Sequence, residues 1–117
     1  MGYNEVRMLV HRFILVSSIP ERIFFPDYDQ SKMIKIADDF ILKYHVPIRK
    51  VKMHCEHLGN LIDGLAYHGT TILDVQMAKN LKSELQPYVE KSSECKRLVS
   101  VLDDAIAQNK YIIHFGI

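Results

Sequence analysis

The 117-residue chain carries 15 Lys and Arg against 14 Asp and Glu, and this formal net charge of +1 excludes the overall basic excess of a dedicated nucleic-acid binder. Its hydrophobic share of 48% and charged share of 25% are ordinary for globular proteins and exclude a largely disordered chain. The length predicts a single domain, residues 1–117. Cys55 and Cys95 are too few for a disulfide framework and indicate reduced thiols, although one bridge between them is left open.

The N-terminal residues predict neither export nor membrane attachment. Glu5 and the lack of a small-residue cleavage site argue against a secretory signal. The apolar run 8–16 is interrupted by His11 and Arg12 and is too short to cross a bilayer. Gly2 is followed by Val6 where a myristoylation motif has Ser or Thr. We therefore expect a cytoplasmic protein with no membrane partner.

Helical periodicity predicts five segments, of which the first two cover residues 4–17 and residues 29 or 31 to 44. The first is apolar on nearly all sides, so it is either central in the fold or shared with a partner. A strand over residues 8–16 is the competing prediction, because Val and Ile are frequent there. The second helix is expected to stop before Pro47, since proline disfavours a helical residue before it.

The third helix is expected to start at Pro47 and to stop by Gly69, with the strongest apolar stripe in the chain. This stripe consists of Ile48, Val51, Cys55, Leu58, Ile62 and Leu65. A fourth helix is predicted from Thr71 until Pro87 kinks or ends it. A fifth is predicted from Ser92 or Ser93 to near Asn109. Together these segments predict an all-α fold, a compact bundle of four or five helices with a minor two-stranded β element at most.

Two further segments, residues 19–28 and 111–117, are apolar but not helical in pattern. Both are too apolar to hang free in water, so we expect them to pack on the bundle, pair with each other or meet a partner. For the C-terminal segment we favour docking within its own chain. The side chains with which these segments would contact a partner are Phe24, Phe25, Tyr111, Ile113 and Phe115.

His54 and His57 are the candidates for a metal site. Their i, i+3 spacing would place both imidazoles on one face of a helix. Neither the Glu-x-x-His pattern of di-iron bundles nor the His-Glu-x-x-His pattern of zinc proteases is present. We favour the interpretation that these histidines flank a core cysteine. A metal-dependent enzyme is kept as an alternative.

A basic stretch, residues 43–54, contains no acidic residue. Its cations are Lys43, Arg49, Lys50 and Lys52. A short corner followed by a basic helix start is compatible with the second half of a helix-turn-helix motif, whose helix N-terminus would favour phosphate. The near-neutral chain favours a solvated basic face instead, so nucleic-acid binding through this stretch remains an alternative.

The preferred function is a non-enzymatic interaction or regulatory module. Its partner would be another protein or a second copy of the chain, and no cofactor is expected. The observation behind this expectation is the excess of apolar surface in a chain that has limited interior volume to hold it.

Overall fold

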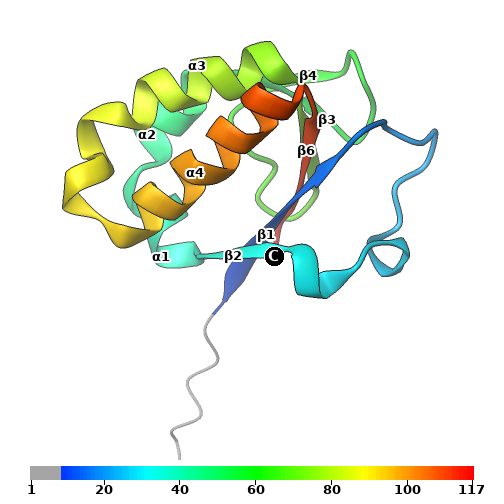
Figure 1. Cartoon of the computed structure of the whole chain (residues 1–117), viewed down its shortest axis with the longest axis horizontal. Coiled ribbons are helices and arrows are strands. Elements are labelled where there is room, and N and C mark those ends of the chain that lie inside the picture. Colours follow the sequence, from blue (N-terminus) through cyan, green and yellow to red (C-terminus); the bar gives the residue numbers. More distant parts are fainter. Residues whose placement is uncertain (1–8) are drawn as a thin grey trace, which may run out of the picture.

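The computed structural model describes residues 9–117, and this part of the chain adopts an α+β fold. Six strands form one antiparallel sheet, and two long helices lie side by side across one of its faces (Figure 1). The predicted all-α bundle is therefore wrong. The predicted start of the first helix at residue 4 lies outside the described residues.

The strands are β1 Val10–Val16, β2 Ile34–Ala37, β3 Lys52–Cys55, β4 Leu61–Asp63, β5 Thr70–Leu73 and β6 Tyr111–Phe115. Their order across the sheet is β2-β1-β6-β5-β3-β4, and every neighbouring pair is antiparallel. The C-terminal segment is thus a central strand, with β1 on one side and β5 on the other. It is held by its own chain, as we favoured for it.

The helices are α1 Asp38–Lys43, α2 His45–Arg49, α3 Val75–Leu85 and α4 Ser93–Gln108, with short 3-10 turns at η1 Phe25–Asp27, η2 Gln30–Lys32 and η3 Gln86–Lys91. Helices α3 and α4 form an antiparallel pair on the sheet (Figure 1). Helix α4 coincides with the fifth predicted helix. Ser92 caps it by accepting from the Cys95 N–H, and Asn109 ends it in the left-handed conformation with φ 55°.

Strand β1 replaces the first predicted helix, as the competing strand prediction anticipated. A strand in a sheet that is covered on both faces carries apolar side chains on both sides. Its sequence therefore lacks the strict alternation that identifies a half-buried strand. Phe13 faces the helices, whereas Ile14 faces the segment of residues 19–33, which covers the opposite face of the sheet. The all-round apolar character of β1 therefore reflects its central place.

The third predicted helix is wrong as well, since residues 47–69 contain the end of α2, strands β3 and β4, and the turns that follow them. Glu56, Gly59 and Gly64 have φ angles of 66°, 94° and 79°. These left-handed values end any helix and suit glycine at two of the three positions. Leu58, which we placed at the centre of the apolar stripe, lies in the β3–β4 turn with 49% of its surface exposed.

The second and fourth predicted helices are each replaced in part by a strand. Residues 34–37 form β2 before α1 begins, and residues 70–73 form β5 before α3 begins. Asp74 separates β5 from α3, because its side chain accepts a hydrogen bond from the Met77 N–H at 2.9 Å.

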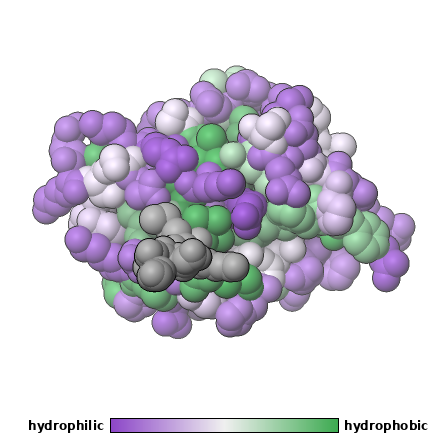
Figure 2. Space-filling model, turned by 90° about the horizontal axis from the view of Figure 1, so that it is seen from below, coloured by the Kyte–Doolittle hydropathy of each residue, from purple (hydrophilic) through white to green (hydrophobic). Residues whose placement is uncertain are grey.

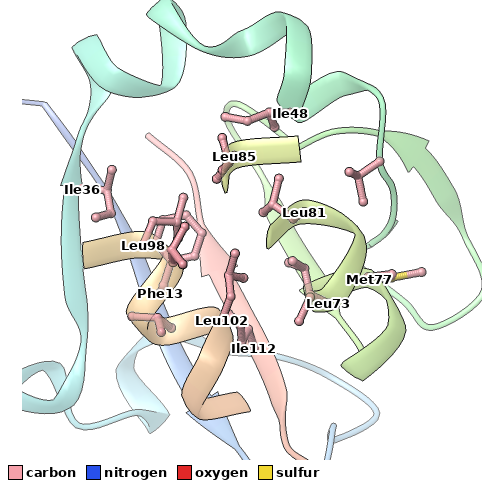
Figure 3. Packing of buried hydrophobic residues seen from close by; sticks show 14 of the residues in the cluster. Phe13, Ile36, Ile48, Leu73, Met77, Leu81, Leu85, Leu98, Leu102 and Ile112 are labelled. Atoms are coloured by element: carbon pink, nitrogen blue, oxygen red, sulfur yellow. The ribbon is translucent and has the colours of Figure 1, made fainter. Parts of the chain in front are cut away.

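The main core lies between the α3–α4 pair and the sheet (Figure 3). Leu81 and Leu85 of α3, Leu98 and Leu102 of α4 and Ile112 of β6 all lie in this layer, and all five are almost fully buried. Within residues 9–117, no helix combines the length and the apolar character needed to span a membrane.

Candidate functional site

A connected set of polar side chains, all buried except the partly exposed Tyr67, lies at one end of this core, and we call it the buried polar chain. It consists of His11, Asp38, Tyr67, Thr71 and His114. Both histidines and Thr71 are fully buried, and Asp38 is 7% exposed. Polar groups removed from water are costly unless they are hydrogen-bonded, and here each member has at least one partner within the set.

Strand register brings three of these side chains together. His114 on β6 lies directly opposite Phe13 on β1 and Thr71 on β5. Because successive side chains alternate between the faces of a sheet, His11, Phe13, Thr71 and His114 all point to the helix-covered face. Asp38 reaches the same place from the first residue of α1, where its backbone N–H donates to the Leu9 carbonyl at 2.9 Å.

The two histidine rings meet end to end. His11 Nδ1 and His114 Nε2 are 2.8 Å apart, and the ring planes differ by only 14° with their centroids 5.1 Å apart. The short nitrogen-to-nitrogen distance and the nearly coplanar rings identify an in-plane hydrogen bond rather than face-to-face stacking. Each imidazole therefore has its orientation fixed by the other.

One assignment of donors and acceptors satisfies every hydrogen bond along the buried polar chain. The Ala66 N–H donates to Thr71 Oγ1 at 2.9 Å, and this hydroxyl lies 3.0 Å from His114 Nδ1, to which it donates. His114 Nε2–H then donates to His11 Nδ1. An ionised carboxylate only accepts, so His11 Nε2–H donates to Asp38 Oδ1 at 2.9 Å, and the Tyr67 hydroxyl donates to Oδ2 at 2.8 Å. Both imidazoles are neutral in this arrangement.

The environment shifts the pKa of two members in ways that fit this arrangement. Burial, followed by repulsion from His11, lowers the pKa of His114 well below its ordinary value. The hydrogen bond to Asp38, followed by burial, raises the pKa of the Tyr67 hydroxyl. His114 therefore stays neutral and Tyr67 stays a hydrogen-bond donor at neutral pH.

Tyr67 also lines a small surface pocket, which we call the α1–α2 pocket. This pocket has a volume of about 200 Å³. It is lined by Ile41, Leu42, His45, Ile48, Arg49, Asp63, Leu65 and Tyr67. Sites for drug-sized ligands measure roughly 300–1,000 Å³, so this pocket suits a single side chain better than a whole small molecule.

The surface around the α1–α2 pocket is apolar and carries cations. Leu42 and Val46 are 51% and 57% exposed, which is high for large apolar side chains. Lys43, Arg49 and Lys50 are also exposed, and none of the three forms an ion pair within residues 9–117. A larger hollow of about 530 Å³ at the start of α4 is lined mostly by polar and charged side chains and has no comparable apolar rim.

The basic stretch does not form the helix-turn-helix that we kept as an alternative for it. Helix α2 has only five residues and is followed by strand β3, so a recognition helix is not formed at this place. Arg49 lines the α1–α2 pocket, and Lys43 and Lys50 are exposed near the ends of α1 and α2. Lys52 pairs with Asp63 across the β3–β4 ladder at 2.6 Å, which compensates its charge.

His54 and His57 lie on strand β3 and in the turn after it, not on one helix face. Both ring nitrogens of His54 have neighbours, since Nδ1 accepts from the Gly59 N–H at 2.8 Å and Nε2 lies 3.3 Å from Asp74 Oδ2. Within residues 9–117, no three His, Cys, Asp or Glu side chains are grouped in a way that could hold a metal ion.

The residues expected to contact a partner are divided between surface and core. Phe24 is 53% exposed, while Phe25 packs edge-on against Phe115 with ring centroids 5.0 Å apart. Ile113 is fully buried and Phe115 is 8% exposed, so the sheet and the 19–33 segment hold both within the chain. Tyr111 is partly buried at the start of β6. Figure 2 shows other patches of hydrophobic surface among charged ones on the face seen from below.

Analysis of the sequence missed all five members of the buried polar chain. None of them was expected at a site, and His11 was noted only as an interruption of the apolar run 8–16. A signal exists, because each histidine stands inside an apolar β-branched run, two residues from Phe13 and from Ile112 respectively. Once those runs are interpreted as strands, both histidines must point into the core.

These features define the protein as an α+β domain that has the buried polar chain under its helices and a small apolar pocket beside it. A scan of protein-family models finds no match to this chain, and neither do searches of curated proteins and of solved structures.

Proposed function

We propose that this protein is a non-enzymatic interaction module that binds a partner protein through the α1–α2 pocket and its rim. The observation that carries the proposal is the exposure of Leu42 and Val46 beside an apolar pocket. Protein interfaces centre on a few apolar anchors that fill small pockets, surrounded by a polar rim. The pocket volume of about 200 Å³ is suited to such an anchor.

The charges around the pocket favour an acidic partner. Lys43, Arg49 and Lys50 lie on or beside α1 and α2, and the chain has no acidic residue from position 40 to position 55. Asp63 lines the pocket but is held by Lys52. Complementary charge speeds association and selects among partners more than it adds affinity. An acidic segment carrying one large apolar side chain would satisfy both the pocket and its rim.

A matched pair of variants tests this location. Leu42→Glu places a charge at the pocket rim, whereas Phe24→Glu places the same charge at a similarly exposed apolar side chain in the 19–28 segment. We expect a partner captured by the wild-type protein to be lost with Leu42→Glu and kept with Phe24→Glu. Loss with Phe24→Glu alone would move the interface to the 19–28 segment and refute the α1–α2 location.

Nucleic-acid binding remains the second candidate, favoured by the exposure of Lys43, Arg49 and Lys50 without ion pairs. A phosphate backbone would be bound by charge alone and would not need the apolar pocket. Elution from a heparin column separates the two candidates. A phosphate-binding surface predicts salt-dependent retention that Arg49→Ala reduces and Leu42→Ala leaves unchanged. We place either function in the cytoplasm, supported by two free cysteines.

A further inference from the structure

The α1–α2 pocket and the buried polar chain share one residue, Tyr67. Its ring lines the pocket, while its hydroxyl donates to Asp38 at 2.8 Å. The same ring contacts His11 edge-on, with centroids 5.5 Å apart and planes at 61°. A change in the histidine pair therefore reaches a wall of the pocket through direct contacts.

Relative to the neutral arrangement, the histidine pair can take up one additional proton but not two. With one added proton the hydrogen bonds reverse, so that His11 Nδ1–H donates to His114 Nε2 and His114 Nδ1–H donates to the Thr71 hydroxyl. The Thr71 hydroxyl then accepts from both the Ala66 N–H and His114, and its own proton turns away from His114. With two added protons, an N–H on His11 faces an N–H on His114 across the 2.8 Å contact, and both rings carry a positive charge. The rings must then separate.

The two rings are not equally free to move. His11 on β1 and His114 on β6 both lie on strands paired on both sides, but the His114 ring is enclosed by Phe13 at a centroid distance of 4.9 Å and by Thr71. His11 is instead bordered by Tyr67, which is partly exposed and lies in the 64–69 segment between strands β4 and β5. The backbone of this segment is held, because the Tyr67 carbonyl accepts from the Ile117 N–H and the Gly69 carbonyl accepts from the Gly116 N–H, both at 2.8 Å. The part that can move when the rings separate is therefore the side chain of Tyr67.

Other titratable groups near the pair come from several elements. Asp38 of α1 accepts from His11, and Glu94 of α4 accepts from the neighbouring Ala37 N–H at 2.6 Å while it pairs with Arg97 at 2.7 Å. On the pocket side, His68 packs against Tyr67 with centroids 4.7 Å apart. His45 and Arg49 of α2 also line the pocket. Of these, His45 is the group whose own titration would act on the pocket directly.

We propose that double protonation of the His11–His114 pair displaces the ring of Tyr67, so that the α1–α2 pocket loses its shape and releases its partner in acid. The release of a partner rests on the proposed function, whereas the change of pocket shape does not. Buried histidines act as pH sensors where their protonation is incompatible with one packed arrangement. Here the incompatibility is the pair itself, and Tyr67 is the link to the surface.

The test is an NMR titration of the whole chain without any partner, on a His45→Gln background that removes the direct effect of His45. It follows the imidazole nitrogens of His11 and His114 together with the methyl groups of Leu65 and Leu42 in the pocket. We expect the pocket methyl signals to change with the same midpoint as His114. The methyl groups of Leu102, which is buried between α4 and the sheet, should not follow, which separates a local change from unfolding.

His114→Gln supplies the matched variant, since it leaves a single imidazole that cannot form a doubly protonated pair. We expect the pocket signals of this variant to stay constant over the pH range in which those of the wild-type protein change. The inference is overturned if the wild-type pocket signals stay constant through the His114 titration, or if His114→Gln leaves their response unchanged. Because no partner is present, these outcomes are independent of the capture experiment that tests the proposed function.

Discussion

Nδ1 of His11 lies 2.8 Å from Nε2 of His114, although both rings are fully buried near one end of the two central strands β1 and β6. Strands β1 and β6 pair through this region, with Phe13 opposite His114. An apolar pair at this place would pack well without any need for partners. The observed pair instead requires Asp38, Tyr67 and Thr71 to complete its hydrogen bonds, which makes this corner of the core sensitive to pH and to single-atom changes.

Stability should fall as the solution becomes acidic. The pKa of His114 is well below 6.5 in the folded protein, so between that lowered value and about 6.5 the unfolded chain binds more protons than the folded one. The free energy of unfolding contributed by this group is therefore kept at neutral pH and falls by about 1.4 kcal/mol per pH unit below about pH 6.5. Urea denaturation at pH 7 and pH 5 measures the change. His57→Gln, at an exposed position, should leave the slope as it is, and a flat profile in the wild type would contradict this prediction.

Removing the Thr71 hydroxyl should also destabilise the fold. Thr71→Val keeps the shape of the side chain but deprives both His114 Nδ1 and the Ala66 N–H of their partner. Leaving buried groups unpaired costs about 1–3 kcal/mol. Thr70→Val is the control, because Thr70 is the neighbouring strand residue on the opposite face and is only partly buried. Equal denaturation midpoints for the two variants would show that the hydroxyl of Thr71 contributes nothing.

Leu58 and Leu81 test the corrected fold directly. Leu58 is 49% exposed in a turn, so Leu58→Ala should change stability by less than about 0.5 kcal/mol. Leu81 is fully buried between α3 and the sheet, and Leu81→Ala should cost about 2–5 kcal/mol. Thermal or chemical denaturation of both variants gives the comparison. A large loss at Leu58 would instead support the helical stripe that the sequence pattern predicted.

How far the sequence predicted the fold depends on the burial of each element. Helix α4 has one apolar face and one solvated face, together with a Ser92 cap, so its period is clear and its bounds were predicted closely. Strands β1 and β6 are covered on both faces, and their apolar runs carry no alternation that separates strand from helix. Their pairing partners are also far away in sequence, which local patterns do not reveal.

The site was less predictable than the fold. Lys43, Arg49 and Lys50 were identified as an exposed basic group, and their exposure follows from their charge. The pocket beside them could not be predicted, because Leu65 and Tyr67 reach it from a segment that was assigned to the end of a helix. Asp38 and His11 are 27 positions apart, and their 2.9 Å contact depends on the β1–β2 pairing that places α1 over the end of β1.

The two cysteines should react at very different rates, because Cys55 is not the core cysteine that the sequence pattern predicted. Cys95 is fully buried on α4, with Sγ 3.5 Å from the Leu85 carbonyl, and burial raises its pKa. Cys55 is only partly buried at the end of β3, and its pKa is raised chiefly by burial and then by Glu56. Since the thiolate is the reactive form, access decides between two thiols that are both protonated at neutral pH.

We therefore expect one thiol per chain to react with a disulfide reagent in the native protein, slowly and faster at alkaline pH, and a second only after denaturation. Cys55→Ser should abolish the native reaction and leave the denatured reaction at one thiol. Cys95→Ser should keep the native reaction but lower stability by about 1–3 kcal/mol, because a hydroxyl would replace a buried thiol. Rapid native labelling that survives Cys55→Ser would mean that α4 exposes Cys95, and the packing of α4 on the sheet described above would then be incorrect.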